Sequence, residues 1–595
     1  MRSSYSWSMT KPDYISFANI LIQIQLFALS GERFTYAFQL TREKAIRSYS
    51  TELFLSYQSI AASLPKETSK EAQLLDRPRL RKTIPSGQNQ LPLHIRIAKG
   101  IYEESLPWIV SFILPLLASF ALQSNIPLWS HLFAETSFLI YCTHKMLNKL
   151  NVPTDIESPL RQWEDVANLV WQSQDNIDDR REFLMGWFYD KKFEKLRMED
   201  AISYLAWMRY GLPLEYGVLT EEEISSLCEF DLPLLLDHVN DGKELPARME
   251  NESPLPFIRF NCEPLRYRHK SLLFYGVTHG ANYIFQQMLK KSGFEFVPAK
   301  NADTDLSYWY RLPSAHDQNL SEKQESKPLV FIHGVGGLGF CNGLVQDLKD
   351  ATASDNVPIV LIDLPHVSLR MYDEIPQIKA QTTAISQILD DINEKVGNFS
   401  HGKATLVGHS YGTVVMSWLV QSEPDRIGGC VFLDPICFQL HLKTTLFNFH
   451  LQRVDQHVQK GKPWSNPFAL ESLVNLAGTE MHTNYAMLRK FSWASNALWP
   501  TDLVSKGIPS KVLLSGSDEI VPVRDVERLF QDFSDHVETH TFENASHGDM
   551  FVDESMRSLA LEKIISVMNL SRQIENDETK LGTKHELLLT DPVTV

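Results

Sequence analysis

The chain is poor in cysteine, and no two of its cysteines are spaced as Cys-x-x-Cys. This scarcity argues against a disulfide framework and gives no zinc-site pattern. We therefore interpret the thiols as buried or free side chains in an intracellular, reducing compartment. The six cysteines are Cys142, Cys228, Cys262, Cys341, Cys430 and Cys437.

The chain also lacks an excess of positive charge and a convincing signal peptide. Its formal net charge is -16, which disfavours binding to the phosphate backbone of nucleic acids. The first apolar run starts late and is interrupted by Asn19, Gln23 and Gln25, and no clear cleavage site follows it. Hydrophobic content of 43% and charged content of 22% are typical of a folded protein.

A length of 595 residues is too great for one ordinary core, so we expect several domains. The pattern predicts a mainly helical N-terminal region over 1–150 and a helical domain over 151–311. The polar stretch 312–327 is interpreted as a linker. An α/β domain is expected over 328–572, followed by a polar, disordered tail over 573–595.

The segment 106–122 has 17 residues and carries no charge, which is the lower limit for a membrane-spanning helix. Pro115 lies in its middle, and the run 126–141 behind it carries His131 and Glu135. Three interpretations stay open: a single span, a hairpin that enters one leaflet, and a buried core helix. Membrane association would place the protein at the endoplasmic reticulum or a lipid droplet.

Apolar residues recur at helical spacing in the region before residue 300. Helices are expected around 163–170, over 201–210 and over 272–288, and the acidic run Glu221 to Glu223 after Thr220 predicts a first helical turn. The aromatic side chains of these helices are interpreted as core residues.

From residue 328 onward, short runs rich in β-branched residues alternate with helical stretches such as 378–396 and 411–420. This alternation predicts a doubly wound, mostly parallel α/β sheet, whose functional sites gather at the carboxyl ends of the strands. The expected strands are 328–333, 357–363, 403–409, 429–434, 510–516 and 537–542.

The first expected strand leads into the glycine-rich loop His333-Gly-Val-Gly-Gly337. Backbone N–H groups in such a loop can hold a negatively charged oxygen during acyl transfer. A phosphate-binding loop is the rival interpretation, but the Lys-Ser/Thr of a P-loop is missing. A plain glycine turn is the third alternative.

The sequence Gly408-His-Ser-Tyr-Gly412 follows the expected strand 403–409 and precedes a helical run. This strand–turn–helix setting suits a nucleophilic serine, Ser410, and side chains in place of Gly408 and Gly412 would clash in the turn. His409 is interpreted as a packed residue of the turn rather than as the base.

Negative charge on a reaction intermediate would need hydrogen-bond donors beside Ser410. The backbone N–H of Tyr411 lies at the expected helix N-terminus, where the helix dipole favours negative charge. The N–H of Val335, or that of Gly336, is the expected second donor.

An acid and a histidine complete the pattern. Asp518 follows the strand 510–516 and can orient a histidine, with Glu519 as a weaker candidate. Asp434, at the end of the strand 429–434, is a rival acid. His547 follows the last strand, so the chain order is serine, acid, histidine, which is the order of the α/β-hydrolase layout.

On these four motifs, residues 328 to about 570 resemble an α/β-hydrolase domain of the esterase, lipase and peptidase type. The stretches 182–188 and 264–276 resemble the long N-terminal extensions of large eukaryotic, fungal-type members, and this carries no residue-level function. The resemblance implies a cap near 437–505. The serine at 410 argues against epoxide hydrolases and dehalogenases, which by resemblance would have aspartate there.

The expected reaction is hydrolysis of an ester through an acyl-enzyme on Ser410, with His547 as base and Asp518 orienting it, without metal or organic cofactor. Aromatic residues of the cap could line a lipophilic acyl pocket or could only pack the cap onto the core. A peptidase, thioesterase or acyltransferase with the same triad stays open, as does a membrane-tethered, non-catalytic binding protein. The sequence does not indicate an oligomeric state.

Overall fold

The computed structural model describes residues 126–150, 157–174, 177–262, 265, 269–301, 306–312, 327–353, 357–372, 374–396, 403–450 and 477–589. The chain divides into two compact units, Met1–Ile84 and Pro85–Val595, and every described residue lies in the second. The apolar segment 106–122 and nearly all of the expected linker 312–327 lie outside the described residues.

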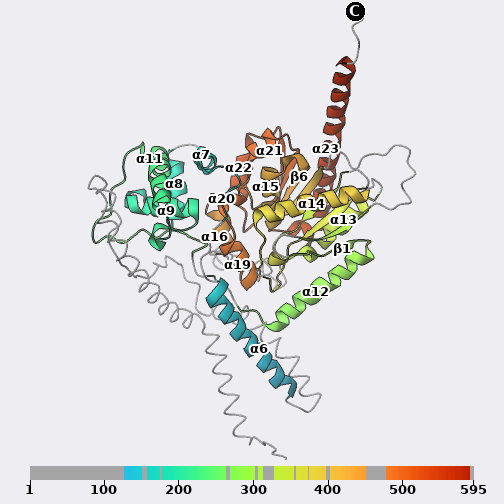
Figure 1. Ribbon diagram of the computed structural model, residues 1–595, viewed down its shortest axis with the longest axis horizontal. Coiled ribbons are helices and arrows are strands. Elements are labelled where there is room, and N and C mark those ends of the chain that lie inside the picture. Colours follow the sequence, from blue (N-terminus) through green and yellow to red (C-terminus); the bar gives the residue numbers. More distant parts are fainter. Residues whose placement is uncertain are drawn as a thin grey trace, which may run out of the picture. The chain divides into compact units, whose positions relative to one another are not determined.

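An eight-stranded, mostly parallel sheet organises the second unit (Figure 1). Its spatial order is β1-β2-β4-β3-β5-β6-β7-β8. The strands β3 to β8 pair in parallel and coincide with the six strands expected from the sequence. The strands are β1 Glu295–Val297, β2 Ser307–Arg311, β3 Leu329–Ile332, β4 Ile359–Asp363, β5 Ala404–His409, β6 Ile427–Leu433, β7 Ser510–Ser515 and β8 Val537–Phe542.

The two faces of this sheet bury alternate side chains in two hydrophobic clusters, as the two-residue period of a strand requires. On β3, Val330 and Ile332 belong to one cluster, whereas Leu329 and Phe331 belong to the other. Helices α14 (Ile378–Val396) and α15 (Tyr411–Ser422) contribute to the first cluster. Helices α13 (Asn342–Ala351) and α23 (Glu554–Leu589) contribute to the second. The sheet is therefore covered on both faces, which fits strands that are buried throughout.

The sheet begins earlier in the chain than the sequence analysis expected. Strands β1 and β2 are antiparallel and extend the sheet beyond β4, so that it starts at Glu295 rather than at residue 328. The periodicity missed them because β1 is only three residues long and the aromatic run of β2 is flanked by polar residues.

The described residues before the sheet are mainly helical. The expected helices around 163–170, 201–210 and 272–288 are present, and Thr220 caps the helix that begins at Glu221. The helices are α6 Ile126–Lys145, α7 Trp163–Gln172, α8 Ile177–Trp187, α9 Met198–Tyr210, α10 Glu221–Ser226, α11 Leu232–Asn240 and α12 Leu272–Lys291, with the π-helical turns η4 Met146–Leu150 and η7 Leu227–Asp231 and the 3-10 turns η5 Phe193–Lys195 and η6 Leu214–Tyr216.

Many aromatic residues of these helices are core residues, as expected, whereas Phe133, Tyr141 and Tyr283 are exposed. Trp187 is fully buried and its indole N–H donates to the carbonyl oxygen of His441, 3.1 Å away. Tyr275 donates to a carboxylate oxygen of Glu480 at 2.6 Å. These contacts join the N-terminal helices to the segment between β6 and β7 within one hydrophobic cluster.

The segment between β6 and β7 is helical where the structure describes it. Its helices are α16 Thr444–His450, α19 Met481–Arg489, α20 Trp493–Asn496 and α21 Pro500–Ser505. Phe438 packs edge-on against Phe432 of β6 and Phe530 of α22 (Val523–Gln531), and Trp499 stacks on His441. Phe438 and Trp499 therefore pack this segment onto the core, which was the alternative to lining an acyl pocket. Trp464 and Phe468 lie outside the described residues.

Within the described part of the chain, no helix is long and apolar enough to cross a membrane. The run 126–141 belongs to α6, in which the carboxylate of Glu135 is buried and accepts the backbone N–H of Leu272 at 3.0 Å.

The last helix corrects the expectation for the C-terminal tail. Helix α23 continues to Leu589, whereas a disordered tail was expected from residue 573. The segment 573–589 is polar but contains no proline and is rich in Glu, Lys and Leu, which all favour helix. Polarity alone therefore did not predict where the helix ends.

Candidate active site

The turn between β5 and α15 holds Ser410 in a strained conformation. Its φ is 50° and its ψ is −116°, a region that costs on the order of 1–3 kcal/mol for a residue other than glycine. A Cβ atom at Gly412 would overlap the carbonyl oxygen of Ile332 at the end of β3, and a Cβ at Gly408 would overlap the sulfur of Met416. Gly412 is therefore required by the close approach of backbone segments, whereas a Cβ at Gly408 would meet the Met416 side chain first and then, at 3.0 Å, the backbone of Gly412.

Three side chains that are far apart in the sequence form a continuous hydrogen-bonded chain. The Oγ atom of Ser410 lies 3.0 Å from Nε2 of His547, and Nδ1 of His547 lies 2.7 Å from Oδ2 of Asp518. All three side chains are buried. Each follows the carboxyl end of a parallel strand, respectively β5, β8 and β7.

Asp518 is fixed by its own turn. Its Oδ1 atom accepts the backbone N–H groups of Ile520 at 2.7 Å and Val521 at 3.0 Å. This leaves Oδ2 to accept the Nδ1 proton of His547, so that the imidazole in its neutral form presents an unprotonated Nε2 to Ser410. Glu519, the weaker candidate, does not make this hydrogen bond.

The surroundings of His547 strongly favour its protonated form. Burial by itself lowers its pKa, but the charge and hydrogen bond of Asp518, together with the charges of Asp434 and Glu519, raise the pKa to about 9. A histidine in this environment accepts a proton readily and stabilises the resulting imidazolium.

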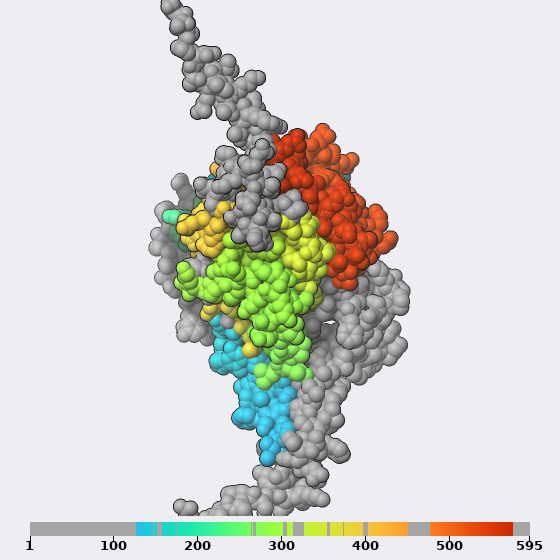
Figure 2. Space-filling model, turned by 90° about the vertical axis from the view of Figure 1, so that its right-hand side faces the viewer, coloured from blue at the N-terminus to red at the C-terminus, as the bar shows by residue number. Residues whose placement is uncertain are grey.

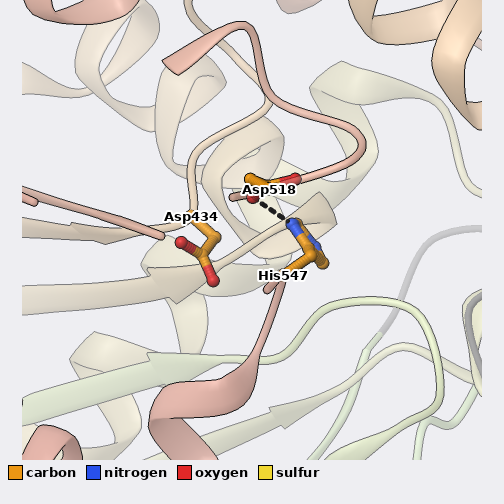
Figure 3. A group of neighbouring side chains, drawn as sticks. All are labelled: Asp434, Asp518 and His547. Atoms are coloured by element: carbon orange, nitrogen blue, oxygen red, sulfur yellow. Dashed lines mark hydrogen bonds and ion pairs between the residues drawn. The ribbon is translucent and has the colours of Figure 1, made fainter. Parts of the chain in front are cut away.

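Asp434, the rival acid, lies beside this histidine without bonding to it. Its Oδ1 accepts the backbone N–H of Ser515 at 2.9 Å, and its Oδ2 accepts that of Gly548 at 2.8 Å. Figure 3 shows the hydrogen bond of His547 running to Asp518 and not to Asp434. Burial, followed by the charge of Asp518, raises the pKa of Asp434 to about 7.

The expected oxyanion donors need one correction. The N–H of Gly336 donates to the carbonyl oxygen of Val367 at 2.8 Å, so it is not free to bind substrate. The N–H of Val335 meets no acceptor among the described residues, and Tyr411 is the first residue of α15, where the N–H has no partner within the helix. Val335 and Tyr411 thus remain the candidate donors.

Two residues that the sequence analysis did not single out hold the glycine-rich loop in place. A Cβ at Gly334 would lie 2.8 Å from both the Cβ of Ser410 and Nδ1 of His409. The buried His333 accepts the N–H of Leu364 at Nε2 (2.9 Å), and its Nδ1 lies 2.7 Å from the carbonyl oxygen of Gly334. In the sequence, the dipeptide His333-Gly334 at the start of the loop could have indicated that these residues fix the loop.

His409 is packed inside the turn. Its ring lies 5.2 Å from that of His547 and 4.6 Å from that of Phe551, between centroids. Burial, together with the neighbouring His547 and His333, holds the pKa of His409 well below its ordinary value. The sequence pattern predicted a packed residue of the turn, rather than the base, at this position.

One ligand atom each from Asp434, Asp518 and His547 lie within 4.8 Å of one another, a spacing that a metal ion could also use. However, each carboxylate oxygen already accepts a hydrogen bond from a backbone N–H or from His547. The hydrogen bonding fits proton transfer better than metal ligation.

Comparison with a family model agrees with the fold. Residues 329–560 match the model of the alpha/beta hydrolase family. Among solved structures, the chain resembles a membrane phospholipase A described as a bacterial virulence factor (13% identity, 50% of this chain and 94% of that chain, TM-score 0.33).

It also resembles a thermophilic esterase from Thermogutta terrifontis (12% identity, 46% and 99%, TM-score 0.32) and naproxen esterase from Bacillus subtilis (14% identity, 48% and 96%, TM-score 0.32). None of the curated proteins matches the chain.

Proposed function

We propose that residues 329–560, which match the model of the alpha/beta hydrolase family, form a serine hydrolase domain that cleaves carboxylic esters through an acyl-enzyme on Ser410. The observation that carries the proposal is the unbroken hydrogen-bonded chain from Ser410 through His547 to Asp518. A serine hydroxyl is a weak nucleophile at neutral pH, and this arrangement is the one that activates it.

In the first half of the reaction, Oγ of Ser410 attacks the acyl carbonyl carbon while its proton passes to Nε2 of His547. The negative charge that develops on the carbonyl oxygen is bound by the N–H groups of Val335 and Tyr411. The tetrahedral intermediate then collapses, the bond to the leaving alcohol breaks, and His547 gives its proton to that alcohol.

In the second half, a water molecule gives a proton to His547 and attacks the acyl-enzyme. Collapse of this second intermediate releases the carboxylic acid, and the proton returns from His547 to Ser410. Asp518 keeps the imidazole in one tautomer throughout both halves and stabilises its charged form.

A fluorophosphonate probe tests this function directly, because it labels only an activated serine. We expect labelling of the full-length protein and its loss in Ser410→Ala. Ser422→Ala is the matched control, since Ser422 ends the same helix α15 and only donates to the carbonyl oxygen of Trp418. Absence of labelling in the folded wild type would instead favour the non-catalytic binding protein.

A substrate panel separates the reactions that share the triad. Esters, amides, thioesters and alcohol acceptors distinguish an esterase from a peptidase, a thioesterase and an acyltransferase. We expect p-nitrophenyl esters to be the fastest substrates, with longer acyl chains preferred over acetate.

An exposed apolar surface on two helices supports contact with lipid. On α12, the exposed residues Val277, Gly280, Ala281, Ile284 and Met288 follow helical spacing and carry no charge. Helix α6 adjoins α12 in Figure 2 and exposes Ile126, Phe133 and Ile140 as well. Exposed patches of this kind are typical of lipid or protein contacts.

Membrane association, with its location at the endoplasmic reticulum or a lipid droplet, is therefore part of the proposal. Flotation with phosphatidylcholine vesicles tests it. We expect the double substitution Val277→Asp and Ile284→Asp to abolish binding, while Val218→Asp, an equally exposed control position, leaves binding intact. A wild-type protein that does not float with vesicles contradicts this part of the proposal alone.

A further inference from the structure

The buried carboxyl group of Asp434 lies beside the triad, and the reaction described above does not use it. It follows β6, the strand between those that lead to Ser410 and Asp518. Its backbone φ is 42°, a conformation that aspartate tolerates better than most residues. A fully buried carboxylate held in an uncommon backbone conformation calls for a physical explanation.

The hydrogen bonds of Asp434 join three neighbouring strand ends. Its N–H continues the β6–β7 pairing by donating to the carbonyl oxygen of Leu513 at 2.9 Å. Its carboxylate accepts both the N–H of Ser515 (2.9 Å) and the hydroxyl of Ser515 (3.1 Å) at the end of β7. The same carboxylate accepts the N–H of Gly548, the residue after His547, at 2.8 Å.

Above its pKa of about 7, Asp434 holds Gly548 as a charged acceptor, and this fixes the loop that carries His547. Gly548 has a φ of 81°, so its backbone conformation is available chiefly to glycine. A charge-assisted hydrogen bond is stronger than one to a neutral acceptor. The carboxylate of Asp434 thus fixes the backbone next to His547, while Asp518 fixes the imidazole ring.

The charge of Asp434 also acts on His547 directly. One oxygen of Asp434, one oxygen of Asp518 and one ring nitrogen of His547 lie within 4.8 Å of one another (Figure 3). The other titratable groups that face His547 are Glu519 and the neutral His409. Two buried carboxylates therefore lie close enough to one imidazole to act on its charge, and one of them, Asp518, is hydrogen-bonded to it.

We infer that Asp434 is a second positioning carboxylate of the active site, which holds the His547 loop through Gly548 and adds its charge to that of Asp518 in stabilising the imidazolium. The inference rests on the proposed serine hydrolase function. It assigns Asp434 a role beside Asp518 rather than in place of it, because Asp434 makes no hydrogen bond to the ring.

The substitution Asp434→Asn tests this assignment. Both oxygens of Asp434 accept a backbone N–H, so an amide in either orientation turns its NH2 group toward a donor. We expect kcat for a p-nitrophenyl ester to fall about 10- to 100-fold, less than the roughly 10²–10⁴-fold that general-base catalysis supplies because His547 itself remains, while KM changes little. The acid limb of the kcat/KM profile should move to lower pH, since removal of a negative charge makes the imidazolium less stable.

Asp231→Asn is the matched control for loss of a buried carboxylate. Asp231 is buried between Trp163 and Arg209 in the helical region and belongs to none of the strand ends at the site. It should lower the melting temperature without moving the pH profile. If Asp434→Asn behaves like this control, the inference is overturned and Asp434 is only structural.

Ser515→Ala keeps the test decisive if Asp434→Asn does not fold. This variant removes the hydroxyl that donates to Asp434 but keeps the backbone N–H. Its acid limb should shift in the same direction by a smaller amount, and an unchanged limb overturns the inference. If the folded wild type neither hydrolyses esters nor reacts with fluorophosphonate, the proposed function fails and this inference falls with it.

Discussion

The Nε2 atom of His547 lies 3.0 Å from the Oγ atom of Ser410, although 137 positions separate the two residues. The adjacent residue, His409, faces His547 and Phe551 instead and makes no such contact with the hydroxyl. Folding of the sheet therefore selects the distant histidine as the partner of the serine.

Ser410→Ala should remove ester hydrolysis almost completely. Loss of the nucleophile in a triad leaves only the contribution of oxyanion donors and binding, so we expect a fall in kcat of at least about 10⁴-fold. The melting temperature should change little, because alanine fits where the serine side chain lies. Steady-state kinetics and a thermal melt on the same preparation provide the measurement.

Ser422→Ala should keep wild-type kinetics in the same assay. Hydrolysis that persists in a folded Ser410→Ala variant would show that another residue is the nucleophile.

Gly412→Ala should destabilise the domain severely. The new Cβ would lie 2.7 Å from the carbonyl carbon of Ile332 and 3.0 Å from the carbonyl oxygen of His333, and neither backbone group can move without displacing β3. We expect a loss of roughly 3 kcal/mol in the free energy of unfolding, at the upper end for overpacking. Denaturant titration measures it.

Gly280→Ala is the opposite case and serves as the control. A Cβ at Gly280 in α12 meets nothing within 4 Å, so alanine should stabilise the helix by about 0.5–1 kcal/mol. Equal effects of the two substitutions would mean that the turn at 412 is not as tight as its contacts indicate.

The parallel part of the sheet could be predicted because its strands are buried on both faces. Continuous runs such as that of β4 are apolar whichever face each residue meets. Strands β1 and β2 could not be recognised, since they are short and β2 joins the sheet by pairing with β4, which lies downstream in the chain. The grouping of Ser410, Asp518 and His547 could be predicted because their order and their placement after strands are both visible in the sequence.

The details that fix each role depend on contacts between distant residues. Gly336 looked equivalent to Val335 as a donor, and only the carbonyl oxygen of Val367 distinguishes them. Asp434 and Asp518 both follow a strand and looked like alternatives. Their roles differ because both oxygens of Asp434 accept a backbone N–H, whereas Asp518 binds backbone N–H groups through Oδ1 alone and keeps Oδ2 for His547.

Hydrolysis should become faster as the pH rises from 7 toward 9. His547 must be neutral to accept the proton of Ser410, and its neighbours raise its pKa to about 9. The midpoint of the ascending limb of kcat/KM should therefore lie above the ordinary histidine value of 6.5. A pH–rate profile on a neutral ester measures this midpoint, and a limb centred at or below pH 6.5 contradicts the proposed surroundings of the base.

Thermal stability should show the opposite trend with pH. The folded-state pKa values of His547 and Asp434 are both raised, to about 9 and about 7, so the folded protein holds protons that the unfolded chain releases. For Asp434 this stabilisation is complete below the unfolded value of 3.8 and is lost as the pH rises through 7. For His547 it is complete below 6.5 and is lost through pH 9.

Melting curves of the wild type and of Asp434→Asn isolate the Asp434 contribution. The loss of melting temperature between pH 4 and pH 7 should be smaller in the variant. Parallel curves for the two proteins would contradict the raised pKa of Asp434.

Asp518→Asn should be more harmful than its small change in size suggests. The Oδ1 atom of Asp518 accepts the N–H groups of Ile520 and Val521, so the amide oxygen of asparagine will stay there and its NH2 group will face Nδ1 of His547. That nitrogen must then be unprotonated, which puts the proton on Nε2 and leaves no acceptor for the proton of Ser410. We expect kcat to fall on the order of 10⁴-fold at pH 7, with KM within a few-fold of wild type.

The comparison with Asp518→Ala distinguishes a wrong tautomer from a lost charge. Alanine removes the carboxylate without imposing the tautomer that blocks Nε2, and Asp434 remains as a nearby negative charge. Alanine should therefore retain more activity than asparagine at this position, in spite of the larger cavity that it leaves. If asparagine is the milder substitution, Asp518 does not set the tautomer of His547, and its role would be limited to charge.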